Sequence, residues 1–273
     1  MSQFDKIEES SDFIRQRLSQ VPKVAIVLGS GLGNLTEKMS IDLRIPYGVI
    51  PHFPPATVKG HQGELIAGQL GDHYVLAQSG RYHYYEGYEM KVVTFPIRVF
   101  KSLGIDILIM ASAVGGIHED YEAGDVTVVN DHINLHHENP LNGPNDERLG
   151  PRFPDMVDAY DPDLIGYCHA AAHDENINLH DSIYAGLPGP NIETKAEYKF
   201  LHIIGATVVG MSTVPEVLVA KHMSMRSCVL TAVTNKCYPI SSIREISHDE
   251  VIQIAKKTED KISRIVMGLL SRI

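Results

Sequence analysis

The chain has 273 residues, of which 44% are hydrophobic and 21% are charged, and this composition fits one globular domain over residues 1–273. Its formal net charge of −10 disfavours a nucleic-acid partner, because binding to a phosphate backbone depends on clustered Lys and Arg. A small anion is not excluded, since a few donors that converge in a concave site can hold one whatever the net charge.

The cysteines and the N-terminus bear on the cellular compartment. Cys168, Cys228 and Cys237 show no C-x-x-C spacing, so neither a disulfide framework nor a thiolate zinc site is indicated. The first residues lack the basic-then-apolar order of a signal peptide, and no apolar run approaches the ~18–20 residues of a membrane helix. We therefore expect a protein of the reducing cytoplasm without a membrane partner.

Short β-rich runs recur along the chain and predict strands. In chain order they are Lys23–Leu28, Tyr74–Gln78, Ile105–Met110, Asp125–Val129, Ser182–Leu187, Thr207–Gly210 and Cys228–Val233. Several are apolar throughout rather than alternating, which is typical of strands buried on both faces of a sheet that helices cover. The sequence therefore predicts a three-layer α/β domain.

Capping boxes predict where helices begin. Thr194, Thr213 and Ser247 are each followed three positions later by Glu, and each opens a run with helical periodicity. The last run is expected to form a long C-terminal helix with one apolar face, made by Val251, Ile254, Ala255, Ile262, Ile265, Val266 and Leu269. Polar side chains stand just before or at these helix starts, where sites in α/β folds commonly gather; they are Glu193, Ser212 and His248.

Polar loops follow several of the apolar runs, and together they contain the donors for an oxyanion. The loops are Gly29–Gly33, Arg81–Tyr88, Ser112–Gly116 and Met211–Glu216. They supply backbone N–H groups, hydroxyls, an arginine and a histidine, which suit a free inorganic oxyanion better than a nucleotide. This inventory indicates phosphate as a reactant.

The glycines at 29, 31 and 33 do not form a dinucleotide fingerprint. The third glycine comes one residue early for G-x-G-x-x-G, and the chain has no G-K-[ST] motif that would supply a P-loop lysine. Two interpretations remain open for this turn. Either Ser30 and the neighbouring N–H groups face a small anion, or the segment is a plain strand-to-helix turn.

The Arg81-x-His83 pair gives the stronger signal for an anion. A guanidinium forks onto two phosphate oxygens, and an imidazole adds a donor whose charge follows pH. We expect Glu86 to orient the His83 ring, with an exposed loop carrying an incidental Arg and His as the alternative. The surrounding tyrosines predict a wall for a planar or hydroxylated ligand; they are Tyr82, Tyr84, Tyr85 and Tyr88.

His132, His136 and His137 raise the question of a metal site, and we expect none. Their segment is predicted to be a strand end that continues into a loop, and no nearby carboxylate completes an H-E-x-x-H arrangement. We expect these histidines to be structural hydrogen-bond partners instead.

Asn235 lies beyond the end of the run Cys228–Val233, where parallel sheets bind ligands. Its amide offers a donor and an acceptor together, and Glu193 adds an acceptor, so the pair can recognise the edge of a purine. A turn-forming asparagine is an equally good interpretation of Asn235 taken alone.

Ordered motifs over nearly the whole chain resemble the trimeric class of purine nucleoside phosphorylases. These motifs are LGSGLG at 28–33, Gly60-His61, GRYHYYEGY at 80–88, GPNIET at 189–194, VGMSTVPE at 209–216 and Thr234-Asn235-Lys236. The resemblance implies the nucleoside phosphorylase fold, a single domain with a central mixed, largely parallel sheet flanked by helices. It also implies a homotrimer in which Phe153 reaches the site of the neighbouring subunit.

Site roles follow from the same resemblance. The implied phosphate ligands are Ser30, His61, Arg81, His83, the backbone of Ala113, and Ser212. The implied ribose contacts are Tyr85, Met211 and His248, and the implied base contacts are Glu193, Asn235 and Ile192. The catalytic roles are assigned to Asn235, Glu193 and His83, with inorganic phosphate as co-substrate and neither a cofactor nor a metal.

Some positions depart from the family pattern. Ser112-Ala113-Val114 replaces Asn-Ala-Ala, which matters little if the phosphate contact is the Ala113 N–H. Ile192 stands where an aromatic residue is common, so stacking on the base is weakened, and Cys237 replaces an aliphatic residue near the base.

The resemblance implies reversible phosphorolysis of purine nucleosides or deoxynucleosides. Asn rather than Asp at position 235 resembles the branch of the family that favours 6-oxopurines, inosine and guanosine, over adenosine. A nucleoside hydrolase would not need Arg81 and His83, and a 5′-methylthioadenosine phosphorylase would be expected to have an acidic residue at position 235 and a small apolar one at 248. A non-catalytic nucleoside-binding protein is the alternative from another functional class.

Overall fold

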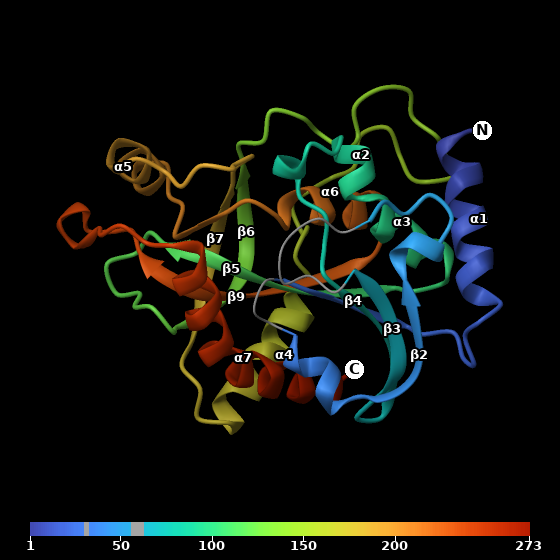
Figure 1. Cartoon of the computed structure of the whole chain (residues 1–273). Coiled ribbons are helices and arrows are strands. Elements are labelled where there is room, and N and C mark those ends of the chain that lie inside the picture. The colour runs from blue at the N-terminus through green and yellow to red at the C-terminus, as the bar shows by residue number, and fades with distance from the viewer. Residues whose placement is uncertain (30–32, 56–62) are drawn as a thin grey trace.

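The computed structural model describes residues 1–29, 33–55 and 63–273. Within these ranges nine strands form one sheet in the order β2-β3-β4-β1-β5-β8-β7-β6-β9, and β5 also pairs with β9 (Figure 1). The strands are β1 (Val24–Leu28), β2 (Ser40–Pro46), β3 (Glu64–Leu70), β4 (His73–Ser79), β5 (Ile107–Gly116), β6 (Val126–Asn134), β7 (Leu179–Gly186), β8 (Val208–Gly210) and β9 (Arg226–Lys236). The sheet is mixed, as predicted.

β1 forms the centre of the sheet and is buried on both faces. It runs parallel to β4 on one side and to β5 on the other. Its alternate side chains enter different hydrophobic clusters, with Ala25 and Val27 on one face and Ile26 and Leu28 on the other. This two-sided burial explains why the run is apolar at every position.

The second half of the sheet curves back on itself. β5 pairs in parallel with β9 along its length, and its last residues, Gly115 and Gly116, pair antiparallel with β8. β8, β7, β6 and β9 complete the circuit. The ends of strands that are distant in sequence therefore meet at one edge.

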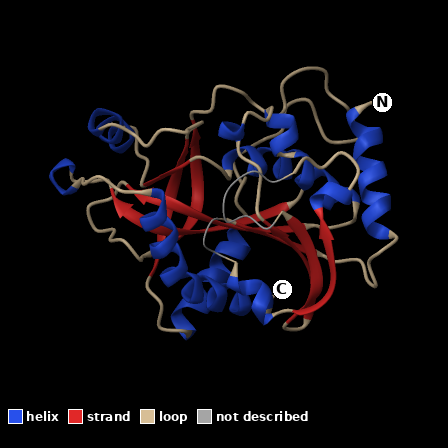
Figure 2. Cartoon of the chain, viewed as in Figure 1, coloured by secondary structure: helices blue, strands red, loops and turns tan. Residues whose placement is uncertain are grey.

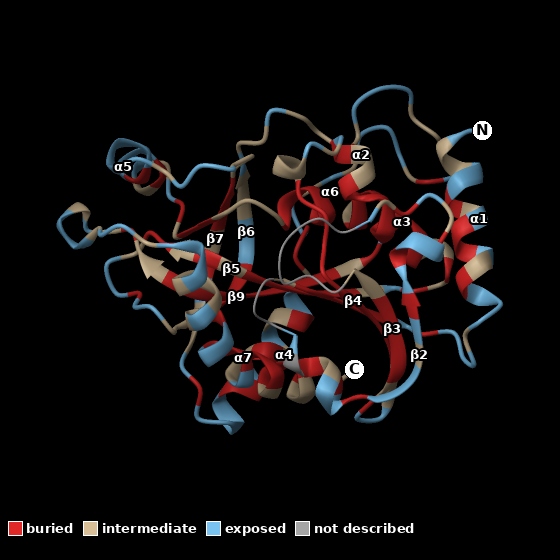
Figure 3. Cartoon of the chain, in the orientation of Figure 1, coloured by how far each residue is buried: buried red, intermediate tan, exposed pale blue. Residues whose placement is uncertain are grey.

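Helices cover both faces of the sheet (Figure 2). α1 (Gln3–Arg15), α2 (Met90–Val93), α3 (Phe95–Ser102) and α6 (Val214–His222) lie on one side, and α4 (Pro162–Asp174) and α7 (His248–Leu270) pack together on the other (Figure 1). α5 (Lys195–Ile203) lies near the β7 end over a third cluster. Buried residues concentrate in the strands and on the sheet-facing sides of the helices (Figure 3).

The predicted runs include the central strands of the sheet but miss the edge strand β2 and its neighbour β3. β2 and β3 have no counterpart among the predicted runs, because only Ile45 of β2 is buried and β3 carries Gly and Gln among its apolar residues. β9 is longer than predicted and includes Asn235. The predicted helix starts are confirmed at α5, α6 and α7.

In the described part of the chain, none of the helices combines the length and the apolar character needed to cross a bilayer.

Candidate functional site

A cavity of about 640 Å³ opens at the edge where several strands end. Its volume lies in the range of sites that hold small organic molecules. The lining comes from the last residues of β5 and β9, the segments after β4, β7 and β8, and the start of α7. The predicted site residues that it brings together are Arg81, His83, Tyr85, Ala113, Ile192, Glu193, Met211, Ser212, Asn235 and His248.

Arg81 follows β4 and is only 1% exposed. Its Nη1 donates to Glu216 Oε2 at 2.9 Å and to Thr213 Oγ1 at 3.2 Å, and its Nη2 donates to the Ala111 carbonyl at 2.6 Å. Glu216 lies in the first turn of α6 and is also buried. The ion pair fixes the guanidinium at the cavity wall and excludes the exposed-loop alternative for Arg81.

His83 is oriented by Glu86, as predicted. Its Nδ1 lies 3.2 Å from Glu86 Oε1, and its backbone N–H donates to the same oxygen at 2.7 Å. A carboxylate partner favours the proton on Nδ1. The imidazole also stacks on Tyr85 with ring centroids 4.7 Å apart. Burial raises the pKa of Tyr85 to about 12, so its hydroxyl stays a neutral donor.

The turn between β8 and α6 contributes hydroxyls to the same end of the cavity. Ser212 Oγ lies 3.2 Å from Ser112 Oγ and 3.3 Å from Thr213 Oγ1. Thr213 has a φ of 69°, a strained conformation for a β-branched residue, and its N–H donates to Glu216 Oε2 at 3.0 Å. Glu216 therefore fixes both this turn and Arg81.

Gly29, at the end of β1, completes this wall. A Cβ at this position would stand 2.6 Å from the Ala111 carbonyl oxygen, so only glycine lets the backbone of this segment approach β5 so closely. Ala113 lines the cavity two residues further along β5 than Ala111. Hydroxyls, backbone groups and one guanidinium are thus gathered at this end, which suits an anion with several oxygens.

Ile192, Glu193 and Asn235 line another part of the cavity. Asn235 pairs with Gly115, four residues further along β5 than Ala111, which Arg81 contacts, and we call this the opposite end. Glu193 directly precedes Thr194, whose hydroxyl caps α5 by accepting from the Glu197 N–H at 3.2 Å. Burial raises the pKa of Glu193, and a hydrogen bond from Tyr198 offsets part of that rise.

Asn235 has both ends of its amide engaged. Nδ2 donates to Cys237 Sγ at 3.0 Å, and Oδ1 accepts from Thr234 Oγ1 at 3.1 Å. A primary amide has a second N–H and a second lone pair. One donor and one acceptor are therefore left after these two contacts, and Asn235 lines the cavity.

Met211 and His248 line the cavity between these elements. His248 is the first residue of α7, directly after Ser247, whose hydroxyl accepts from the Glu250 N–H at 3.3 Å. The capping box thus places His248 at the cavity wall.

Three predicted site residues are not among the described residues that line this cavity. Ser30 and His61 lie outside the described residues. Phe153 is 86% exposed and is not among the described lining residues, with the Arg152 guanidinium 5.5 Å from its ring centroid.

The predicted wall of tyrosines is confirmed only for Tyr85. Of the tyrosines around His83, Tyr85 alone is among the described residues that line the cavity. Tyr82 is buried and donates to the Pro54 carbonyl at 2.7 Å, and Tyr88 donates to the Pro55 carbonyl at 2.9 Å. These side chains pack the loop against its neighbours instead.

The expectation for the histidines is confirmed in part. His132 Nδ1 lies 3.1 Å from the Tyr160 hydroxyl. For His136 the prediction is wrong, because neither ring nitrogen has a hydrogen-bond partner among the described residues. His136 packs near Gly186 and Val214, and burial lowers its pKa to about 4.

Sequence reasoning missed Tyr198 and the role of Glu216. Glu216 was identified only as a helix cap, and no local pattern signals its pairing with Arg81, which is 135 positions away. Tyr198 could have been found, because it lies in the first turn after the Thr194 cap and five positions beyond Glu193.

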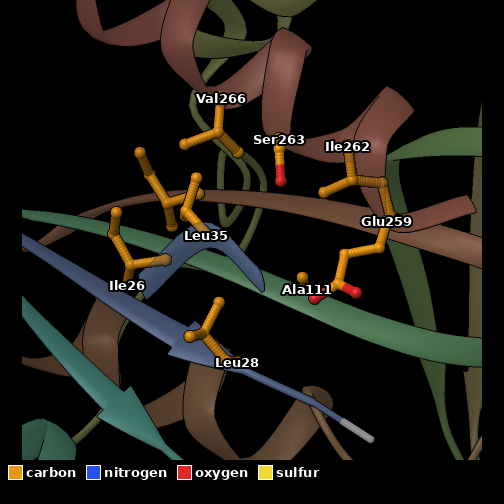
Figure 4. A pocket seen from close by; sticks show the side chains of 9 residues that line it. Ile26, Leu28, Leu35, Ala111, Glu259, Ile262, Ser263 and Val266 are labelled. Carbon is orange, nitrogen blue, oxygen red and sulfur yellow. The ribbon is translucent and has the colours of Figure 1, made fainter. Parts of the chain in front are cut away.

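A second cavity lies between β1, β5 and α7 and measures about 10 Å³ (Figure 4). Its walls are mainly apolar, and Glu259 and Ser263 reach towards it from α7. This volume suits one water molecule and excludes a nucleoside.

Comparison with known proteins gives consistent results. The model of the phosphorylase superfamily matches residues 23–271. Purine nucleoside phosphorylase 1 of Bacillus subtilis is 42% identical over 268 residues, which cover 98% of each chain.

Solved structures agree over the same length. The crystal structure of isoform 2 of purine nucleoside phosphorylase from Schistosoma mansoni, in complex with cytosine and ribose-1-phosphate, superposes with a TM-score of 0.94 at 34% identity and covers 99% of this chain and 97% of that one. A schistosome purine nucleoside phosphorylase in complex with hypoxanthine gives a TM-score of 0.92 at 34% identity, with 98% and 97% covered.

Proposed function

This chain belongs to the phosphorylase superfamily and, within it, to the purine nucleoside phosphorylases, and from that premise we propose that its large cavity binds a purine nucleoside beside inorganic phosphate. The reaction is reversible phosphorolysis. The bond between the purine nitrogen and the sugar C1′ breaks, a phosphate oxygen bonds to C1′, and the products are a free purine and ribose or deoxyribose 1-phosphate. The observation that carries this proposal is the polarity of the cavity, with a buried guanidinium and clustered hydroxyls at one end and Glu193 with Asn235 at the other.

Phosphate is assigned to the end of the cavity that contains Arg81. The guanidinium, the His83 imidazole and the Ser212 hydroxyl are convergent donors for its oxygens, and the Ala113 N–H is assigned as a backbone donor. Ser30 and His61 are proposed as further ligands on the family resemblance. Held in this way, phosphate stabilises the positive charge that develops on the sugar as the glycosidic bond breaks.

The sugar is assigned to the middle of the cavity, against Tyr85, Met211 and His248. Tyr85 and His248 provide hydrogen-bonding groups, and Met211 provides an adaptable apolar surface. His248 is proposed to meet the 5′-hydroxyl.

The base is assigned to the end formed by Ile192, Glu193 and Asn235. An ionised Glu193 accepts the N1–H of a 6-oxopurine, and an Asn235 N–H donates to N7 as the departing base gains electron density. Adenine has no N1–H, so this pair favours inosine and guanosine over adenosine.

A homotrimer is proposed with Phe153 as the contact between subunits. The support is the resemblance, together with the exposure of two large apolar side chains close in sequence, Phe153 at 86% and Val157 at 84%. Sedimentation equilibrium checks this, and a monomeric mass would contradict it.

A single domain over 1–273 and a cytoplasmic location are proposed alongside. The continuous sheet from β1 to β9, against which α7 packs, supports the single domain. Three free cysteines, all buried, fit a reducing compartment.

The test is to mix purified protein with inosine and follow hypoxanthine release with and without phosphate, and then to repeat with adenosine. Phosphate-dependent release from inosine, with little from adenosine, is expected. Release without phosphate would indicate a hydrolase, and binding without release would indicate a nucleoside-binding protein.

A further inference from the structure

Cys237 is a buried thiol at the base end of the cavity that the proposed reaction does not use. It is 0% exposed and follows directly after β9. Its Sγ accepts a hydrogen bond from Asn235 Nδ2 at 3.0 Å and lies 3.8 Å from the Asn235 carbonyl oxygen. The thiol is therefore a direct partner of the amide assigned to the purine.

The other partner of this amide, the Thr234 hydroxyl, has two possible acceptors. Thr234 Oγ1 lies 3.1 Å from Asn235 Oδ1 and 3.0 Å from the Val114 carbonyl oxygen. A threonine hydroxyl has one hydrogen, so it donates to one of these oxygens at a time. The thiol is thus the contact that holds the nitrogen end of the amide whichever oxygen Thr234 serves.

Gly115 packs closely against this contact. A Cβ on Gly115 would stand 2.8 Å from Cys237 Sγ and 3.6 Å from Asn235 Nδ2. Tyr198 acts on the thiol as well, lowering the pKa of Cys237 against the larger effect of burial. Burial raises the pKa of Cys237 to about 12, so the sulfur is a neutral thiol that can both accept and donate.

We propose that Cys237 is a positioning residue for base recognition, whose thiol holds the Asn235 carboxamide so that its second N–H is presented to purine N7. This inference rests on the proposed function. An apolar residue of similar size would fill the same space without fixing the amide, which would then be free to rotate between orientations that offer N7 a donor or an acceptor.

The test compares Cys237→Val, Cys237→Ser and the matched control Cys228→Val in phosphorolysis of inosine. Cys228 is equally buried within β9, and its Sγ lies 3.4 Å from Cys168 Sγ rather than against Asn235. Cys237→Val is expected to lower kcat about tenfold with KM changed less than about threefold, since it removes one oriented hydrogen bond. Cys237→Ser is expected to stay within about threefold of the parent because a hydroxyl also accepts and donates. Cys228→Val is expected to leave both constants unchanged.

A double-mutant cycle separates positioning from general damage to the fold. In an Asn235→Ala background, Cys237→Val is expected to change kcat by less than about twofold, because the amide it positions is gone. An unchanged kcat in Cys237→Val, a Ser variant as impaired as the Val variant, or a full tenfold loss in the Asn235→Ala background would each overturn the proposal.

Failure of the proposed function would look different. The parent protein itself would then release no hypoxanthine with phosphate present. Calorimetric titration with hypoxanthine then tests Cys237 without turnover: at least about threefold weaker binding by Cys237→Val supports the positioning role, and unchanged affinity overturns it.

Discussion

The two ends of the cavity are built differently. At the proposed phosphate end, Arg81 and Glu216 are 1% and 3% exposed, and an ion pair joins Arg81, which follows β4, to Glu216 in α6. At the base end, Ile192 is 47% exposed, and Glu193 lies in the segment that leads into α5. The comparison shows that Arg81 and Glu216 belong to the core of the fold, whereas Ile192 lies nearer the surface, where it can change without disturbing the core.

The largest effect is expected from Arg81→Ala, which breaks the buried ion pair. Glu216 would be left buried without its cation, and we expect a loss of about 3–5 kcal/mol in the free energy of unfolding, together with loss of activity. Urea unfolding measures the change.

The matched control is Arg15→Ala, which removes an ion pair with Asp12 that is 40% and 59% exposed and should cost less than about 1 kcal/mol. If the two variants were equally stable, the phosphate end would not depend on the buried pair.

Asn235→Ala tests the proposed base end. Here we expect activity to fall while the stability of the fold is unchanged. Removing one donor that acts mainly in the transition state should lower kcat roughly 10²–10³-fold, about 3–4 kcal/mol in the activation barrier. The urea midpoint should stay close to that of the parent. Near-normal turnover of inosine would show that Asn235 is not the donor to N7.

The pH dependence of inosine cleavage is expected to report Glu193. Its pKa is raised by burial, so the ionised form that accepts N1–H dominates only above that raised pKa. As pH falls through it, kcat/KM for inosine should fall, approaching a tenfold loss per pH unit. Adenosine, whose N1 accepts rather than donates, should lose less over the same range.

A Glu193→Gln variant provides the control for this fall in kcat/KM at low pH, the acidic limb of the profile. Gln does not titrate, so the acidic limb assigned to Glu193 should disappear from its kcat/KM profile. Persistence of the same limb would assign it to another group.

The smallest effect is expected from Ile192→Phe. An aromatic ring at this half-exposed position can stack on the base, and such contacts contribute about 0.5–1.5 kcal/mol. KM for inosine should therefore fall by roughly two- to tenfold, with kcat changed little. A rise in KM would indicate that Ile192 packs on the base better than a ring does.

Sequence patterns predicted those strands and helix starts that are determined by residues close to one another in the sequence. The apolar run at β1 and the capping boxes at Thr194 and Ser247 carry their own signals, because burial on two faces and helix capping depend on nearby residues. β2 gave no such signal because its edge position leaves most of it exposed.

Individual site residues could be predicted only where they lie within a recognisable sequence motif. Pairs of residues that are distant in sequence could not be predicted, since nothing near Arg81 in the sequence indicates that Glu216 is its partner. Asn235 and Cys237 are only two positions apart in the sequence. Their contact could still not be predicted, because it depends on packing against Gly115 and Tyr198, which only the fold brings beside Cys237.

The central claim is that phosphate is the nucleophile held at the Arg81 end of the cavity. Phosphorus NMR of a reaction with inosine and inorganic phosphate tests it most directly, with hypoxanthine followed in the same sample. Ribose 1-phosphate should appear mole for mole with hypoxanthine as inorganic phosphate is consumed. Hypoxanthine formed with free ribose, while inorganic phosphate stays constant, would contradict the account.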